Sequence, residues 1–307
     1  MYQREKERFG MKHMTALVSC FARAYHFKNS VEPVFGDHVA DRLLTEREYG
    51  EIADNMAAGI SYFAPDFSGS KEEALRHIVN SQLAPSVLAR SAFCERALEN
   101  EIGLGCRQYV IFASGYDTYF LRRENPELVV YELDLPDMIA DKKRRIEAAG
   151  LKDLCRQRFV PCDLSERGWG DILEQKGFCR KGRSFGSLLG LSYYLEKEDF
   201  AKLLSSIQSL WGEGSAICFD YPVCEEGRES AVNRELAAGA NESMKAKYTY
   251  KEMEKLLAEN GFLIYEHLDE KLATGQFFEK YNQENPGYEM KAPKGVNYCL
   301  AVRKGTI

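Results

Sequence analysis

The stretch Tyr109-Val110-Ile111-Phe112-Ala113-Ser114-Gly115 indicates the fold of this chain. Residues 109–113 form a short, continuous apolar run, which is typical of a strand buried on both faces. Ser114 and Gly115 end the run with small residues that suit a tight turn. A strand buried on both faces predicts a sheet with helices on each side of it.

Strand and helix patterns alternate after this run. Strands are expected at 128–133, 158–160, 187–191, 215–220, 262–267 and 297–302. Helices are expected at 136–150, 169–175, 196–210, near 225–240 and at 249–260. Earlier in the chain, helices are expected at 14–27 and 72–101, and Pro85 should end or kink the second one. The alternation predicts an α/β fold, a Rossmann-like, doubly wound, mostly parallel seven-stranded sheet.

The domain organisation follows from length and pattern. The 307 residues suit one large α/β domain, and we find no internal repeat, low-complexity tract or linker. We expect a single domain over 1–307, with an N-terminal helical cap at 1–105 and an α/β core at 106–307.

Composition excludes several classes of protein. A net charge of −6 counts against binding to nucleic acid or to an anionic membrane surface. The longest basic run, 142–145, is expected to be the solvated face of a helix. No apolar stretch approaches the roughly 20 residues of a membrane span. The nine cysteines have no zinc-ligand spacing, so we expect no metal site, and reduced thiols predict a cytoplasmic location.

Candidate binding residues follow the first three predicted strands. In a doubly wound sheet, ligands bind beyond the carboxyl ends of the strands. Small residues at 113–115 would let a ligand approach the backbone, Asp134 could accept both hydroxyls of a ribose, and Asp163-Leu164 could bond and pack an adenine. Each feature also has a plain structural alternative, namely a tight turn or a helix N-cap. Together and in this order, they predict a pocket for an adenine nucleoside.

The sequence discriminates between nucleoside cofactors. A dinucleotide site needs G-x-G-x-x-G, but Ala113 and Thr118 stand at the first and third glycine positions. The G-x-x-x-x-G-K-[ST] phosphate loop does not occur in the sequence either. A ligand with adenine and ribose but no phosphate fits better, and S-adenosylmethionine is such a ligand.

These motifs resemble the leucine carboxyl methyltransferase family, which includes protein phosphatase methyltransferases and polyketide O-methyltransferase-like proteins. The resemblance spans about 13–303, and its G-x-D-T and E-x-D-x-P motifs are fairly specific to the family. The matching segments are Thr15-Ala16-Leu17, Arg23-Ala24, Ala89-Arg90-Ser91-Ala92-Phe93, Gly115-Tyr116-Asp117-Thr118, Glu132-Leu133-Asp134-Leu135-Pro136, Asp163-Leu164 and Tyr194-Leu195.

The resemblance implies a role for each matching position. Arg90 would pair with the methionine carboxylate of S-adenosylmethionine, and Gly115 would offer its backbone to the methionine moiety. Asp117 would hold the turn. Asp134, beside Leu135, would bind the ribose. Asp163 and Leu164 would bind the adenine, and the helical cap would act as a cofactor lid.

The chain departs from the family at two cofactor-site positions. Ala113 replaces a glycine, and its methyl group could tighten the pocket. Leu189 replaces a glutamate after the fourth strand, where an apolar residue can neither hold an amine nor act as a base. Leu189 therefore puts the substrate and activity in question.

The leading hypothesis is O-methyl transfer to a small-molecule or carboxylate acceptor. A catalytically impaired cofactor-binding protein and an NAD-dependent reductase are the alternatives. Tyr193, Tyr194 and Tyr221 follow strands four and five and could line an acceptor pocket, although core packing is the better explanation for any one of them because the chain has 17 tyrosines. The five histidines show no paired constellation, so no catalytic residue is assigned.

Overall fold

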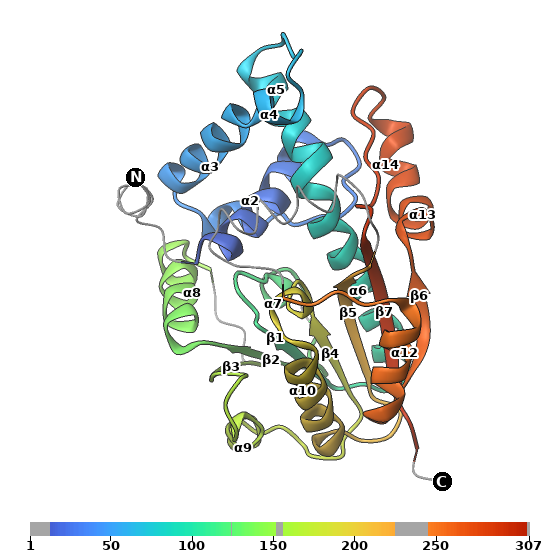
Figure 1. Ribbon diagram of the computed structural model, residues 1–307. Helices are drawn as coiled ribbons and strands as arrows, with labels where there is room; N and C mark the ends of the chain where they lie inside the picture. The colour runs from blue at the N-terminus through green and yellow to red at the C-terminus, as the bar shows by residue number, and fades with distance from the viewer. Residues whose placement is uncertain (1–12, 124, 152–155, 225–244, 306–307) are drawn as a thin grey trace.

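The computed structural model describes residues 13–123, 125–151, 156–224 and 245–305. Its centre is a seven-stranded sheet in the order β3-β2-β1-β4-β5-β7-β6, with β7 antiparallel to both of its neighbours (Figure 1). The strands are β1 (Gln108–Phe112), β2 (Val129–Asp134), β3 (Gln157–Pro161), β4 (Ser184–Leu188), β5 (Ala216–Pro222), β6 (Phe262–Leu268) and β7 (Val296–Arg303). The predicted doubly wound sheet is therefore confirmed.

The strand order places the ligand-binding edge of the sheet. β1 pairs in parallel with β2 on one side and with β4 on the other, so the order reverses at β1. All five residues of β1 are buried, as the apolar run predicts. In such sheets, the crevice at the reversal point binds ligands, and the carboxyl ends of β1, β2, β4 and β5 meet there.

Helices cover both faces of the sheet. Alternate side chains of each strand point to opposite faces, so the strands contribute to two separate hydrophobic cores. One core packs β1, β5 and β7 against α2 (Met14–Asn29), α6 (Ala84–Gly103) and α8 (Pro136–Ala148). The other packs the opposite face against α9 (Trp169–Gln175), α10 (Lys197–Leu210) and α12 (Tyr250–Glu259). Both faces are thus buried.

The N-terminal helices lie together beyond one end of the sheet, at the top of Figure 1. They are α2, η1 (Ala40–Leu43), α3 (Glu46–Ala58), α4 (Ile60–Phe63) and α5 (Lys71–Ile78). Capping boxes at Thr45 and Ser70 begin α3 and α5, since each side chain accepts from the backbone three residues on. A short π-helix, η2 (Val79–Leu83), joins α5 to α6, so the expected interruption near Pro85 is confirmed.

The remaining elements are short. α7 (Tyr119–Arg122) follows the turn after β1, and η3 (Ser192–Tyr194) follows β4. α13 (Glu270–Ala273), η4 (Thr274–Phe278) and α14 (Glu279–Glu284) lie between β6 and β7. The helix expected near 225–240 falls outside the described residues. Among the helices that are described, none combines the length and apolar composition of a membrane-spanning segment.

Two sequence expectations are wrong in detail. β4 covers Ser184–Leu188 instead of 187–191, because Gly190 has a left-handed backbone (φ +66°) that a strand cannot continue through. The basic run is not simply a solvated face. Lys142 is fully buried and pairs with the buried Glu132, while Arg145 binds Asp141 and lies largely inside the structure. Burial raises the pKa of Glu132 to about 7, although Lys142 opposes that rise.

Candidate functional site

The turn after β1 brings the backbone to the ligand-binding edge. Ala113 and Gly115 both have left-handed conformations, with φ of +50° and +48°. A Cβ at position 115 would meet the Ala16 Cβ of α2 at 3.3 Å, so the turn packs closely under the first helix. The Asp117 carboxylate accepts the Tyr119 amide at 2.8 Å, a bond within the turn of the kind expected for this residue.

Asp134 joins the turns after β1 and β2. Its carboxylate accepts the Gly115 amide at 2.7 Å and the Leu135 amide at 2.8 Å. The N-cap of α8 is Leu135, without a side-chain bond, so the helix-cap alternative for Asp134 is wrong. Burial raises the pKa of Asp134, while both backbone donors lower it. A carboxylate offers about four lone-pair positions, so Asp134 keeps capacity for ligand hydroxyls.

The residues expected around an adenine lie at the ends of β2 and β3. Asp163 is exposed, and its Oδ1 accepts both the amide and the hydroxyl of Ser165, which lowers its pKa. Leu164 is partly buried against the core, whereas Leu135 is 45% exposed. Leu135 is thus an apolar surface next to Asp134 at the edge of the sheet.

Arg90 of α6 reaches the end of β4. A Cβ on Gly190 would lie 2.6 Å from Arg90 Nη1, so a side chain at this position would displace the guanidinium. Within the described residues, Arg90 makes one hydrogen bond, a 3.4 Å contact with Ser19 Oγ. Its Nη1 also lies 3.6 Å from a carboxylate oxygen of Asp220, beyond hydrogen-bond distance.

Asp220 of β5 is a further residue beside Arg90, and the sequence motifs do not indicate it. It is fully buried and accepts the Gly190 amide at 2.6 Å and the Tyr193 hydroxyl at 2.9 Å. The signal was an acid inside the apolar strand Ala216–Pro222, because a buried carboxylate needs partners. Asp220 therefore joins η3, the turn after β4 and, through Arg90, helix α6.

A second buried acid, Asp37, ties the turn after β1 to the helical cap. It accepts Arg23 Nε at 2.8 Å and the Thr118 hydroxyl at 2.7 Å, and Arg122 Nε lies 3.5 Å away. Arg23 also donates to the Tyr116 carbonyl at 2.6 Å. Asp37 lies in a loop without a recognisable motif, so the sequence carried no signal for it.

The structure separates the three tyrosines expected near an acceptor. Tyr193 lies beside Asp220, and Tyr194 is partly buried in the same core. Tyr221 belongs to the opposite core, because adjacent residues of a strand point to opposite faces. Its hydroxyl contacts His267 Nε2 at 2.8 Å. The expectation that Tyr221 lines the same pocket as Tyr193 is therefore wrong.

The two departures from the family pattern lie at this edge. Leu189 follows β4 directly and is partly buried against the core that holds Arg90's helix. Ala113 holds the left-handed turn that a glycine would adopt without strain. The Ser114 hydroxyl beside it and the Thr15 hydroxyl of α2 are buried with no hydrogen-bond partner in the structure. Orphaned donors around the turn after β1 are compatible with a polar ligand.

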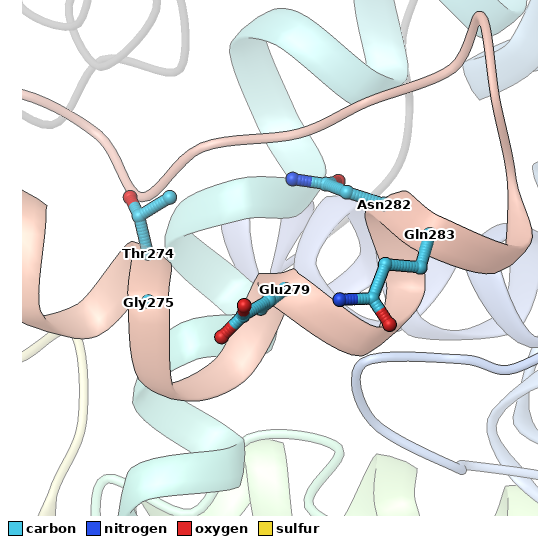
Figure 2. Close-up of a pocket in the computed structure, with 5 residues that line it drawn as sticks. All are labelled: Thr274, Gly275, Glu279, Asn282 and Gln283. Atoms are coloured by element: carbon cyan, nitrogen blue, oxygen red, sulfur yellow. The ribbon is translucent and has the colours of Figure 1, made fainter.

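A surface hollow lies elsewhere, on the helical segment after β6, and is lined by Thr274, Gly275, Glu279, Asn282 and Gln283 (Figure 2). Thr274 Oγ1 accepts the Ala292 amide, and Asn282 binds the backbone of Met290 through both ends of its amide. Two polar side chains that line the hollow, Thr274 and Asn282, thus hold the segment before β7 in place. Across the described residues, no three histidine, cysteine, aspartate or glutamate side chains are grouped as a metal site would require.

Comparison with known sequences agrees with this geometry. A family model described as leucine carboxyl methyltransferase matches residues 16–208. YktD of Bacillus subtilis, which carries the provisional name of an S-adenosyl-L-methionine-dependent methyltransferase, is 36% identical over 303 residues, covering 95% of this chain and 98% of its own. A relative from Mycobacteroides abscessus with the same provisional description is 31% identical over 211 residues, covering 66% of this chain and 67% of its own.

Solved structures share the fold at low sequence identity. A provisionally named methyltransferase from Thermobifida fusca has a TM-score of 0.57 at 13% identity, with 94% of each chain covered. A DUF574 family protein from Streptomyces avermitilis has a TM-score of 0.59 at 13% identity, with 95% of this chain and 97% of its own covered. The family match, the relatives and the failed dinucleotide fingerprint together leave the NAD-dependent alternative without support. The chain belongs to the leucine carboxyl methyltransferase family and is an S-adenosylmethionine-dependent methyltransferase.

Proposed function

We propose that this chain transfers the methyl group of S-adenosylmethionine to an oxygen of a small-molecule or carboxylate acceptor. The observation that carries the proposal is the position of Arg90, a largely buried guanidinium with almost no protein partners at the reversal point of the sheet. Buried arginine donors without partners are costly, and a ligand carboxylate satisfies several of them at once.

The proposal assigns a part of the cofactor to each of these residues along the edge of the sheet. In this proposal Arg90 pairs with the methionine carboxylate, and the turn at Gly115 borders the methionine chain. Asp134 accepts the ribose hydroxyls while it holds two amides, and Asp163 with Leu164 binds the adenine. When bound, the cofactor supplies an electrophilic methyl group, and the chain contributes alignment and exclusion of water, which can be worth about 7–11 kcal/mol.

The acceptor side favours a nucleophile that needs no base. Tyr193 is buried against Asp220, and burial raises its pKa, so it keeps its proton. His26 and His267 are engaged elsewhere, with Val34 and Tyr221. A carboxylate is already ionised at neutral pH and can be methylated without proton removal. The engaged Tyr193, His26 and His267 therefore favour a carboxylate over a phenol or an amine as the acceptor.

The first test is calorimetric titration with S-adenosylmethionine and S-adenosylhomocysteine. We expect micromolar binding that Arg90→Ala and Asp134→Ala each weaken at least tenfold. Arg96→Ala, on the same helix but paired with Glu266, and Asp137→Asn, exposed in α8, are the matched controls and should bind like the parent. Absence of binding by the intact protein would overturn the proposal.

The acceptor is tested by transfer of labelled methyl groups to a panel of carboxylic acids, phenols and amines. We expect base-labile methyl esters as the products. Transfer confined to amines would contradict the oxygen assignment. Cofactor binding without any transfer would support the alternative of an impaired cofactor-binding protein.

A further inference from the structure

A largely buried cation and a fully buried anion form a loose ion pair at the ends of β4 and β5. Arg90 and Asp220 are 3.6 Å apart, too far for a hydrogen bond, with side chains 17% and 0% exposed. Asp220 is the one carboxylate within 4 Å of Arg90 in the part of the chain that the structure describes. A ligand with one group of each charge could form a direct ion pair with both Arg90 and Asp220.

An orphaned hydroxyl marks the same place. Tyr298 of β7 is paired in register with Asp220, so the two side chains leave the sheet on the same face. Its hydroxyl is buried and has no hydrogen-bond partner in the structure. Burial and then Asp220 raise its pKa, and Arg90 opposes this, which places all three groups within electrostatic reach. A protonated, buried donor beside an incomplete ion pair indicates a missing polar ligand.

Two hydrogen bonds fix the Asp220 carboxylate beside Arg90. Gly190 and Tyr193 donate to the two different carboxylate oxygens, which fixes the orientation of the group. Two donors leave lone pairs free on a carboxylate. Leu189 contributes no charge from the neighbouring strand end, so Asp220 is the acid available to a ligand at Arg90.

We propose that Arg90 and Asp220 form a clamp for an amino-acid zwitterion, in which Arg90 binds the carboxylate of the methionine end of the cofactor, Asp220 binds its ammonium group, and Tyr298 donates to the carboxylate. This inference rests on the proposed function and adds the residue that recognises the amine. Asp220 acts here as a cofactor-binding residue.

The test compares three thioethers by calorimetry: S-adenosylhomocysteine, a deaminated analogue that keeps the carboxylate, and a decarboxylated analogue that keeps the amine. Asp220→Asn should weaken binding of S-adenosylhomocysteine about 30-fold, as for loss of one partner of a buried charge pair, and change binding of the deaminated analogue less than about threefold. Arg90→Ala should weaken binding of S-adenosylhomocysteine and of the deaminated analogue, and it should leave binding of the decarboxylated analogue nearly unchanged.

The outcomes separate the clamp from the proposed function. Failure of the parent protein to bind S-adenosylhomocysteine removes the cofactor site altogether. Parent binding with equal losses for both analogues in Asp220→Asn, or with no loss for either, overturns only the clamp. Thermal unfolding of each variant identifies a loss of fold, and Glu196→Gln, outside the clamp near η3, serves as an acid-to-amide control that should leave all three affinities unchanged.

Discussion

Asp37 offers the sharpest test of how the N-terminal helices are attached to the turn after β1. Its side chain is fully buried between Arg23 and Arg122 and also holds the Thr118 hydroxyl. Although burial raises its pKa, the two arginines hold that pKa below its usual value, so Asp37 is ionised in the folded protein. Asp37→Asn keeps the shape but removes the charge between two buried cations. Removing one member of a buried ion pair costs about 3–5 kcal/mol.

The assay is thermal unfolding followed by circular dichroism. For a chain of this size, 1 kcal/mol corresponds to roughly 2–4 °C, so a loss of about 3–5 kcal/mol in Asp37→Asn should lower the Tm by about 6–20 °C. Asp41→Asn is the control, because Asp41 pairs with Lys28 at the surface and should cost no more than about 1 kcal/mol. Asp37→Asn should also bind S-adenosylhomocysteine more weakly, since Arg23 and Thr118, which Asp37 binds, hold the turn after β1 in place. Equal Tm values for the two variants would refute the reasoning.

Three further substitutions test single features of the structure. Ala113→Gly removes the strain of a left-handed alanine, which costs about 1–2 kcal/mol, but it also stabilises the unfolded chain by about 0.4–1 kcal/mol through added entropy. The Tm should therefore rise by about 1–3 °C. A fall in the Tm would show that the methyl group packs favourably. Gly190→Ala would place a methyl group 2.6 Å from Arg90 Nη1, so affinity for S-adenosylhomocysteine should drop at least tenfold, and unchanged affinity would contradict the placement of Arg90. Burial lowers the pKa of His26 from 6.5 to about 4, and its Nε2 accepts the Val34 amide. Because the folded pKa lies below the unfolded one, the neutral ring contributes about 3 kcal/mol above pH 6.5 that is lost as the pH falls to 4. The Tm of His26→Gln should therefore change less between pH 6.5 and 4 than the Tm of the parent. Equal changes of Tm with pH in the two proteins would contradict this role of His26.

The sequence predicted those parts of the fold that depend on local pattern. The run at 109–113 forms most of β1, an interior strand of the sheet, and Asp134 and Asp163 lie at the ends of the next two strands. The order of strands and helices was recovered because a buried parallel strand and an amphipathic helix each carry their own periodicity. The end of β4 was predicted too far along the chain because Leu189 and Leu191 are apolar, while the left-handed Gly190 between them donates its amide to the distant Asp220.

The missed residues depend on contacts between distant segments. Asp220 is 130 positions from Arg90 along the chain, and its partners come from α6, η3 and the turn after β4. Lys142 looks like part of a solvated run until Glu132, on the neighbouring strand, is found buried beneath it. Charge pairs of this kind leave no periodic signal, because the sequence shows each member but not its partner.

The clamp of Arg90 and Asp220 explains why an apolar residue is tolerated at position 189, where the family has a glutamate. Arg90 and Asp220 already supply one buried charge of each sign, and a third charge at Leu189 would have no partner when the ligand is absent. Leu189→Glu alone should therefore lower the Tm. In the Asp220→Asn background, the same substitution would restore an acid next to Gly190, and binding of S-adenosylhomocysteine should partly recover while that of the deaminated analogue does not. Equal effects of Leu189→Glu in both backgrounds would show that position 189 and Asp220 act independently, contrary to a shared site for the amine.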